Sequence, residues 1–487
     1  MNPPILRLYG LVLVLFAALV GFTSYWAIFK SEELQEKPEN RRSLIEAQKI
    51  KRGTVTTVDG TVIAESVPQG QGNERIYTRR YPQGELFGHP LGYSFIELGN
   101  SEIERSEDDV LTGESNEFAT LLDELQGETE EGSNITVTLD AEAQRVATDS
   151  LQSALTVPGT GGAVVAIEPD TGAVRAMVSS PGYDPNTVPQ NFKELSSDDE
   201  NTPLVSRPTQ SIYPPGSTMK VVTATAALDS GEFDQSTTLN ANSGLDVSGV
   251  PLANAGGEDF GTIDMTTALT NSVNTYWAQV GEQLGPETMV EYMRRFGFYA
   301  KPPLDFPADQ LATSGVVNSD GDLVEEAFDV GRVAIGQGGE EGQILATPLQ
   351  MAMVASTVAN GGELMEPTFV QEVTDPDGRT SEELDPQTFS EVMSEDTAAQ
   401  MAEMMTNVAE EGTASSLSVA GSTLAGKTGT SEIDVEASLN QVWFIGFAPA
   451  DDPEIAVAAM IERCTGCFGG EVAGPIATQV MDSLLAN

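Results

Sequence analysis

The sequence has little positive charge. Its 487 residues include 24 Lys and Arg against 74 Asp and Glu, which gives a net charge of −50 at pH 7. Such a chain would repel nucleic acid and anionic membrane surfaces, so we expect neither as a partner. The carboxylates are spread along the chain and do not form one acidic tail. This distribution favours a halophilic, salt-adapted protein, and an ordinary acidic secreted protein is the alternative.

Histidine and cysteine are also scarce. The only histidine is His89, which lies in a separate, N-terminal region from the serine motif described below, so no Ser-His-Asp triad is expected. The two cysteines, Cys464 and Cys467, form one C-x-x-C and cannot supply the four ligands of a structural zinc site. We expect them to form a structural disulfide on the oxidising side of a membrane, with free thiols or a redox pair as alternatives. The sequence predicts no metal and no cofactor.

Long hydrophobic runs are absent with one exception. Residues 8–29 contain no charged side chain, and as a helix these 22 residues would match the thickness of a bilayer core. The run ends in the bulky sequence SYWAIFK, which does not resemble a signal-peptide cleavage site. We therefore expect a cytoplasmic tail (1–7) and a single-pass transmembrane anchor (8–29) in the cell membrane. The rest of the chain would then be extracytoplasmic.

Two regions follow the expected anchor. Residues 30–157 combine a charged neck with short β-like runs such as TVTTVDGTVIAES and NITVTLD. Residues 158–487 begin with a hairpin pattern, GGAVVAIEPDTGAVRAMVSS, and end with two strand-like runs and a closing helix. Between these ends the spacing predicts helices over 217–229, 263–284 and 287–296, and another in TPLQMAMVASTVANGG. The pattern predicts an α+β domain whose sheet is built from both of its ends.

The sequence YPPGSTMKVV at positions 213–222 places a rigid turn, a hydroxyl and an amine close together. Two prolines and a glycine prevent a helix upstream, so we expect a helix to begin near Ser217. Residues three apart share a helical face, and a lysine of lowered pKa at position 220 could take the proton of the Ser217 hydroxyl. By itself, the S-x-x-K pattern is equally compatible with a capping serine and a solvated lysine.

Two further motifs strengthen the catalytic interpretation. NSVN supplies S-x-N at Ser272 and Asn274, and AGKTGTSE supplies K-T-G at Lys427, Thr428 and Gly429. In this order the three motifs are the signature of the penicillin-recognising acyl transferases.

Longer segments resemble the class B penicillin-binding proteins, and the overall length is most like the actinobacterial penicillin-binding protein A group. These segments are YPPGSTMK, SSPGYDPN, AIGQG, ATPLQMA and KTGT before WFIGFAP, with RGTVTTVDGTVIAES and GHPLGY in the first region. The resemblance implies a transpeptidase domain (158–487), with a five-stranded antiparallel sheet between helical layers. It also implies an elongated, mostly-β pedestal (30–157). One departure concerns the pedestal motif R-G-x-I-x-D-R-N-G, whose D-R-N positions hold Thr57, Val58 and Asp59.

The resemblance also implies how the nucleophile works. Ser217 would attack the penultimate D-alanine carbonyl of a peptidoglycan stem peptide, with Lys220 as its base. Desolvation and the charge of Lys427 would lower the pKa of Lys220. Ser272 would relay the proton to the departing D-alanine, and Asn274 would hold Lys220 and the substrate amide.

The remaining residues of the implied site would bind substrate. Lys427 and the hydroxyls of Thr428 and Thr430 suit its terminal carboxylate, and Gly429 lets the backbone approach it closely. The backbone N–H groups of Ser217 and Thr430 would form the oxyanion hole.

The implied activity is that of a D,D-transpeptidase that is acylated by penicillins and other β-lactams. A D,D-carboxypeptidase or a membrane-anchored serine β-lactamase would share the motifs, and a penicillin-sensing receptor or scaffold is the non-enzymatic alternative. A β-lactamase is disfavoured because 155 positions separate Ser272 from Lys427 and because it needs neither anchor nor pedestal. Class membership also implies a SEDS-family glycosyltransferase as partner.

Overall fold

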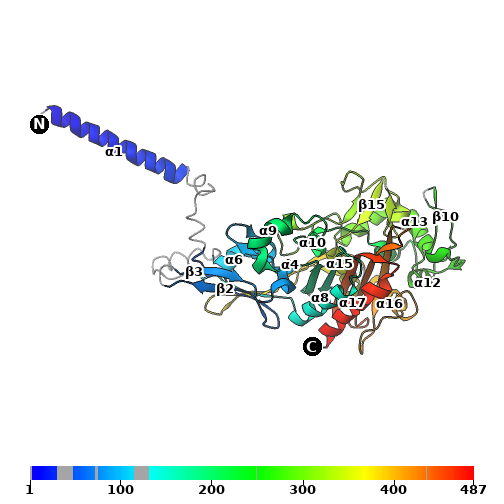
Figure 1. The fold of residues 1–487 in the computed structure, drawn as a ribbon. Helices are drawn as coiled ribbons and strands as arrows, with labels where there is room; N and C mark the ends of the chain where they lie inside the picture. Colours follow the sequence, from blue (N-terminus) through cyan, green and yellow to red (C-terminus); the bar gives the residue numbers. More distant parts are fainter. Residues whose placement is uncertain are drawn as a thin grey trace.

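The computed structural model describes residues 3–29, 48–71, 75–113, 131–247, 249–339, 341–434 and 436–486 (Figure 1). Most of the expected neck lies outside these residues. Pedestal strands lie at one end of the described part after position 48, and helices α12 (Met265–Thr270) and α13 (Asn274–Arg295) lie near the other.

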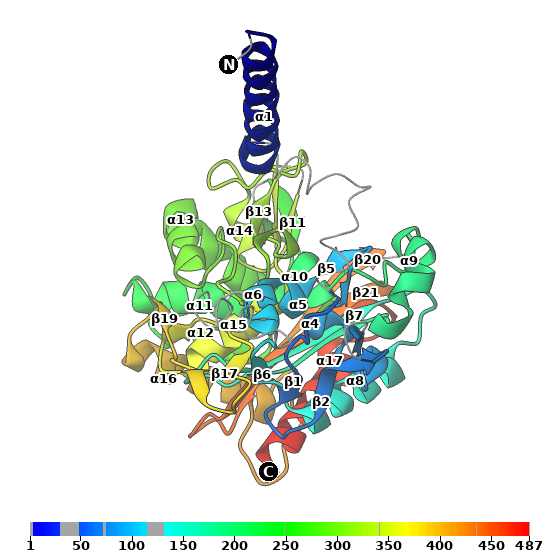
Figure 2. The same cartoon turned by 90° about the vertical axis from the view of Figure 1, so that its left-hand side faces the viewer.

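The pedestal is organised around a six-stranded sheet. Figure 2 shows its middle strands side by side. Its order is β18 (Thr380–Glu383), β17 (Val370–Thr374), β6 (Asn134–Val137), β1 (Val55–Thr57), β2 (Val62–Gln69) and β3 (Ile76–Arg80). Only β1 and β6 pair in parallel; the other neighbours are antiparallel. Because β17 and β18 come from the transpeptidase region, the two regions are joined by a shared sheet and not by a simple linker.

Several short elements follow β3 in the chain, and one of them carries a buried charge. They are η2 (Gly84–Phe87), α4 (Gly88–Leu91), β4 (Ser94–Phe95), β5 (Gly99–Asn100), α5 (Glu102–Ser106) and α6 (Asp108–Thr112). The Glu104 carboxylate is fully buried and contacts Arg79 Nε at 2.5 Å and Arg52 Nη2 at 2.9 Å. Burial alone would raise the pKa of Glu104, but the two guanidinium charges outweigh it and hold the pKa below its usual value.

The departure from the pedestal motif leaves a local turn intact. The Thr57 hydroxyl donates to the Asp59 carboxylate and accepts from Thr61 N at 3.0 Å, while Val58 is exposed. The turn between β1 and β2 is therefore stabilised by hydrogen bonds of Thr57, and the Val58 N–H donates to Leu139 O at 3.1 Å.

A five-stranded antiparallel sheet forms the centre of the transpeptidase region, as expected. Its order is β20 (Ala425–Asp434), β21 (Leu439–Ala448), β22 (Ile455–Thr465), β7 (Gly162–Ile167) and β8 (Val174–Ser180). The runs VWFIGFA, IAVAAMI and GAVVAI are buried on both faces, which is why they are continuously apolar and do not alternate. Strands from the two ends of the domain meet where β22 pairs with β7, so the predicted arrangement is confirmed.

Helices cover both faces of this sheet (Figure 1). Helix α15 (Pro348–Ala359) packs on one face, and α8 (Ala141–Ala154) and α17 (Gly469–Leu485) pack together on the other. Helix α15 begins at Thr347, whose hydroxyl accepts from Gln350 N at 3.0 Å, and Pro348 occupies its first turn. Helix α8 precedes position 157 in the sequence yet packs on the transpeptidase sheet, and the boundary at 157 stays a prediction.

The helices around the sequence motifs differ from expectation. The helix expected from Ser217 begins with a 3₁₀ turn, η4 (Gly216–Met219), before α11 (Lys220–Asp229). The continuous helix expected over 263–284 is wrong, because residues 271–273 separate α12 from α13. The helix expected over 287–296 is the second half of α13, which is kinked at Gly285 before Pro286.

The remaining elements are short apart from α16. They are η3 (Pro185–Thr187), α9 (Val188–Ser196), α10 (Arg207–Gln210), β9 (Leu239–Asn240), β10 (Leu245–Val247), β11 (Val250–Leu252), η5 (Ala255–Gly257), β12 (Thr262–Ile263), η6 (Ala308–Gln310), β13 (Gly315–Val317), α14 (Val330–Val333), β14 (Gly338–Gly339), β15 (Gly342–Leu345), β16 (Glu363–Met365), β19 (Thr388–Glu391) and α16 (Glu395–Glu410).

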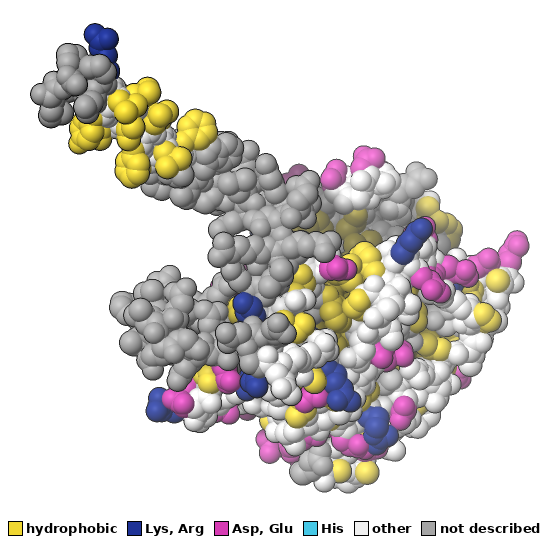
Figure 3. All heavy atoms as spheres, turned by 60° about the vertical axis from the view of Figure 1, so that its left-hand side comes forward, with side chains coloured by type: hydrophobic (Ala, Val, Ile, Leu, Met, Phe, Trp, Pro, Cys, Tyr) yellow, Lys and Arg dark blue, Asp and Glu magenta, His cyan; other side chains and the backbone are white. Residues whose placement is uncertain are grey.

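The N-terminal helix α1 spans Pro3–Phe29. Its apolar side chains from Leu8 to Phe22 are exposed, as the yellow groups in Figure 3 show. Among the residues that the structure describes, no helix meets the combined requirement of length and apolar character for crossing a bilayer. The anchor expected over 8–29 stays a prediction.

Acidic side chains are scattered over the face shown in Figure 3 and do not gather into one patch. Their mutual repulsion should weaken as the Debye length falls from about 10 Å at 0.1 M salt to about 3 Å at 1 M. We therefore expect the melting temperature of the full chain in a non-ionic detergent to rise between 0.1 and 1 M NaCl. An equal osmolality of sucrose controls for solute exclusion, and a flat or falling NaCl curve would contradict salt adaptation.

Candidate active site

Ser217 and Lys220 meet at the turn that begins α11. The two prolines before it stop any helix upstream, and Gly216 adopts a φ of +54°, which favours glycine. The following 3₁₀ turn brings Lys220 Nζ to 2.9 Å from Ser217 Oγ. The predicted contact between hydroxyl and amine is therefore present, although it is made by a tighter turn than an α-helix.

The Lys220 amine is fully buried among oxygen atoms. Besides Ser217 Oγ, it lies 2.7 Å from Ser272 O, 2.7 Å from Asn274 Oδ1 and 3.1 Å from Ser272 Oγ. The two atoms at 2.7 Å are carbonyl oxygens, which only accept hydrogen bonds. A neutral amine can donate to both and keep its lone pair for the proton of the Ser217 hydroxyl. Burial and, second to it, the charge of Lys427 lower the pKa of Lys220 well below its usual value, which favours this neutral form.

Ser272 lies in the break between α12 and α13 with a φ of +57°. This conformation is uncommon for a residue with a Cβ, and such outliers gather at functional sites. The Ser272 hydroxyl lies 2.9 Å from Lys427 Nζ and 3.1 Å from Lys220 Nζ, so it connects the two amines. Burial lowers the pKa of Lys427 to about 7, so close to neutral pH the Lys427 amine can be partly uncharged.

The K-T-G motif lies on β20, the edge strand of the five-stranded sheet, where it packs against η4. A Cβ at Gly429 would lie 2.9 Å from Pro215 O, so glycine permits this close packing. The Thr428 hydroxyl contacts the Thr413 hydroxyl at 2.7 Å, and the Thr430 hydroxyl accepts from Gly469 N at 3.3 Å.

The structure thus brings every residue of the three predicted motifs into one site. It adds two residues that the sequence reasoning missed, Thr413 and Gly469. A glycine pair at 469–470, two residues after Cys467, was a weak signal for close packing, whereas nothing in the sequence distinguished Thr413.

The other candidates lie outside this cluster. Cys464, near the end of β22, forms a disulfide with Cys467, which lies between β22 and α17, and Asn440 Nδ2 donates to Cys467 O at 2.9 Å. His89 is buried in the pedestal helix α4 against Tyr183, and burial lowers its pKa to about 4. Within the described ranges, no group of His, Cys, Asp or Glu could hold a metal ion.

A half-buried serine hydroxyl, a buried amine at hydrogen-bond distance and a second hydroxyl beside a sheet edge define an active-site-serine acyl transferase that uses lysine as its base. The sequence agrees with known proteins of that class. The model of the penicillin-binding protein transpeptidase domain matches residues 162–482, and that of the penicillin-binding protein A dimerisation domain matches residues 52–135. The chain belongs to the class B penicillin-binding protein transpeptidases.

Similar proteins cover almost the whole chain. The peptidoglycan D,D-transpeptidase PbpA of Mycolicibacterium smegmatis is 32% identical, covering 98% of this chain and 97% of that protein. The crystal structure of PBPA from Mycobacterium tuberculosis superposes with a TM-score of 0.78 at 30% identity, over 90% of this chain and 100% of that one. The ceftriaxone acyl-enzyme complex of the same mycobacterial protein gives a TM-score of 0.80 at 30% identity, over 91% of this chain and 100% of that one.

Proposed function

We propose that this protein is a peptidoglycan D,D-transpeptidase that cross-links stem peptides through an acyl-enzyme on Ser217. The observation that carries the proposal is the buried Lys220 amine, which lies 2.9 Å from Ser217 Oγ and donates hydrogen bonds to two carbonyl oxygens. The name of the Mycolicibacterium smegmatis relative, a peptidoglycan D,D-transpeptidase, supports the substrate class. The peptide would end in D-Ala-D-Ala.

Acylation begins when Ser217 Oγ attacks the carbonyl carbon of the penultimate D-alanine and passes its proton to Lys220. The bond from that carbon to the terminal D-alanine nitrogen then breaks. Its nitrogen receives the proton through the Ser272 hydroxyl, which contacts both buried amines. The products of this step are a Ser217 ester and free D-alanine.

Substrate binding falls to the edge strand. Lys427 and the hydroxyls of Thr428 and Thr430 would hold the terminal carboxylate, and Asn274 would hold the peptide amide through its side chain. Strand β20 is the last strand of its sheet, so alternate backbone N–H groups have no strand partner on its outer side. The Thr430 N–H and the Ser217 N–H together would stabilise the oxyanion, often a large part of catalysis.

Transfer to an amine distinguishes the transpeptidase from its rivals. The acceptor amine of a second stem peptide attacks the ester carbonyl carbon and gives its proton to Lys220. The bond from that carbon to Ser217 Oγ then breaks, and Lys220 returns a proton to Ser217 Oγ. A β-lactamase or a carboxypeptidase needs a group that activates water at the ester. None of the hydrogen bonds that Ser217, Lys220, Ser272 and Lys427 make within the described residues involves a carboxylate. This favours the transpeptidase.

The test is intact-mass spectrometry after mixing the full chain with benzylpenicillin. We expect one penicilloyl adduct, located on Ser217 by peptide mapping, that persists for many minutes. An added D-amino acid should accelerate turnover of a thioester substrate more than water alone does. No adduct on folded protein would contradict the proposed function, and loss of the adduct within seconds with catalytic hydrolysis of penicillin would identify a β-lactamase. Fast thioester hydrolysis unaffected by the D-amino acid would identify a carboxypeptidase.

The cellular setting is part of the proposal. Residues 8–29 would anchor the chain in the cell membrane as a single-pass helix, with residues 1–7 in the cytoplasm and the catalytic region outside; the uncharged run supports this. A SEDS-family glycosyltransferase would supply nascent glycan beside the anchor and pedestal. The acidic composition would adapt the exposed surface to high salt.

A further inference from the structure

The carbonyl of Pro214, three residues before Ser217, accepts hydrogen bonds from side chains of the five-stranded sheet. Trp443 Nε1 donates to Pro214 O at 3.0 Å, Gln441 Nε2 at 3.3 Å and Ser431 Oγ at 3.5 Å. These three donors are buried and come from the two neighbouring strands β20 and β21. A single carbonyl outside any regular element therefore receives three side-chain donors.

The prolines explain why this carbonyl matters. Pro214 and Pro215 have no backbone N–H, so the backbone of this segment can accept hydrogen bonds at its carbonyls but cannot donate any. Pro215 O accepts from the Thr218 hydroxyl at 2.7 Å within the same turn. Pro214 O is then the group that fastens the double-proline segment to the sheet. On either side, Tyr213 N donates to Ala346 O at 2.9 Å and Gly216 N donates to Gly336 O at 3.1 Å.

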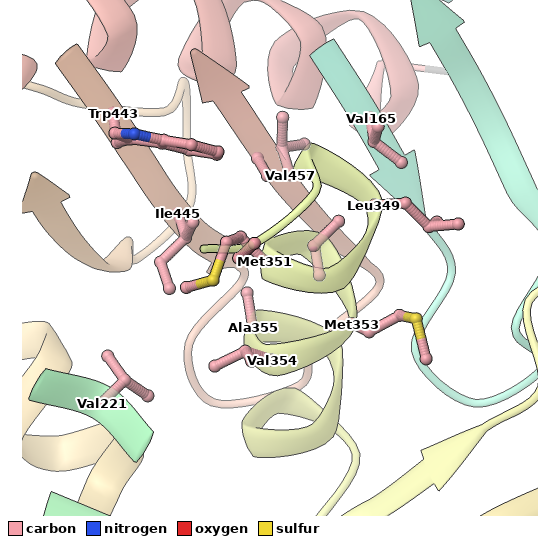
Figure 4. Close-up of a cluster of buried hydrophobic side chains, with 14 of the residues drawn as sticks. Val165, Val221, Leu349, Met351, Met353, Val354, Ala355, Trp443, Ile445 and Val457 are labelled. Carbon is pink, nitrogen blue, oxygen red and sulfur yellow. The ribbon is translucent and has the colours of Figure 1, made fainter. Parts of the chain in front are cut away.

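Trp443 also belongs to the other half of the site. Its backbone pairs with Gly429 of the K-T-G motif in the β20–β21 register. A Cβ at Gly429 would lie 3.0 Å from Trp443 Cβ, so no atom separates the two residues. Figure 4 shows the indole of Trp443 at the end of the buried cluster around α15, on its own strand. One rigid side chain thus connects the nucleophile turn to the strand that carries Thr430.

We propose that Trp443 is a positioning residue for acylation: its indole N–H fixes the Pro214 carbonyl and thereby the separation between Ser217 and Thr430. The indole is fully buried, so it acts through the loop and not on the substrate. The inference rests on the proposed acylation of Ser217. Two oxyanion donors on separate elements must be held to a fraction of an ångström, because small misplacements of reacting groups cost large factors in rate.

The test replaces Trp443 by phenylalanine, which keeps a buried ring and removes the N–H. The matched control is Trp277→Phe, because Trp277 is also fully buried but its Nε1 has no hydrogen-bond partner among the described residues. Trp277 lies one helical turn after Asn274. Its replacement therefore controls for the loss of buried tryptophan packing close to the active site. Acylation by a fluorescent penicillin is followed by stopped flow over a range of concentrations, and melting temperatures are recorded for both variants.

For Trp443→Phe we expect the limiting acylation rate constant to fall about tenfold, the scale of one lost hydrogen bond in the transition state. The half-saturating penicillin concentration should stay within twofold of wild type. For Trp277→Phe both parameters should stay within twofold, with a similar loss of melting temperature. Equal limiting rates in the two variants, or a change only in the half-saturating concentration, would overturn the inference.

A second variant covers the case in which Trp443→Phe does not fold. The double substitution Ser431→Ala with Gln441→Met removes the other two donors and leaves Trp443 in place. We expect a smaller fall in the limiting rate constant, about threefold, again with unchanged half-saturation; an unchanged limiting rate would overturn the role of the Pro214 carbonyl. Failure of the wild-type protein to form any Ser217 adduct would instead contradict the proposed function.

Discussion

Replacing Lys220 by methionine should lower the rate constant for acylation by benzylpenicillin about a thousandfold or more. The substitution removes the amine that contacts Ser217 Oγ and leaves the length of the side chain nearly unchanged. General-base groups contribute roughly 10²–10⁴-fold, and a nucleophile and its base act as a unit. The Ser217→Ala variant gives the lowest measurable rate constant for acylation, and we expect the rate constant of Lys220→Met to lie close to it.

Folding stability separates this effect from unfolding. Lys220 is fully buried and burial lowers its pKa, so an apolar side chain of similar length should fit without a large loss of stability. We expect the melting temperature of Lys220→Met to equal or exceed that of wild type. Lys193→Met on the exposed side of α9 is the matched control, with acylation unchanged. Wild-type acylation by folded Lys220→Met would contradict the assignment of the base.

The second large effect concerns stability and lies in the pedestal. Replacing Glu104 by glutamine should reduce the free energy of unfolding by about 3 kcal/mol or more, because it leaves Arg52 and Arg79 without their shared buried counter-charge. Urea unfolding of the full chain in non-ionic detergent measures the loss. The matched control is Glu65→Gln: Glu65 and Arg80 form an exposed pair at 3.6 Å, worth less than about 1 kcal/mol.

The pH dependence follows from the direction of the shift. The pKa of Glu104 is lower in the folded protein than its ordinary value, so its contribution is fully present above the unfolded pKa of about 4.3. The contribution is lost as the pH falls through the lowered folded pKa. The difference between wild type and Glu104→Gln should therefore be largest near neutral pH and shrink in acid. A difference that does not change with pH would contradict an ionised, buried Glu104.

Much of the fold could be predicted from local pattern. The continuous apolar runs that became β7, β21 and β22 have no polar face to expose, so burial in a central sheet was the available solution. The helix predicted in TPLQMAMVASTVANGG is present as α15, which ends before the two glycines. The order S-x-x-K, S-x-N and K-T-G predicted the family and the chemistry. The reaction requires these side-chain types together, whichever secondary-structure elements position them.

The interruptions of the helices could not be predicted from the spacing of residues in the sequence. The spacing over 263–284 is helical, yet the chain breaks at 271–273 and Ser272 takes a positive φ. Local propensity opposes that conformation for serine, so the contacts of its carbonyl and hydroxyl with Lys220 and Lys427 must maintain it. The 3₁₀ turn η4 could not be predicted from local pattern either, because it depends on direct packing against Gly429, which is far away in the sequence.

By itself, the sequence identified the residues that we propose to do the chemistry, because an uncommon set of residue types in a fixed order has few other uses. It also determined the central sheet, because periodicity reports burial directly. Only the tertiary structure decided which distant groups are in contact. These contacts are the pairing of β17 with pedestal strand β6, the hydrogen bond between Thr413 and Thr428, and the hydrogen bond from Trp443 to Pro214 O. These contacts join residues 15 to more than 200 positions apart, and their partners are chosen by packing in three dimensions, which local composition does not encode.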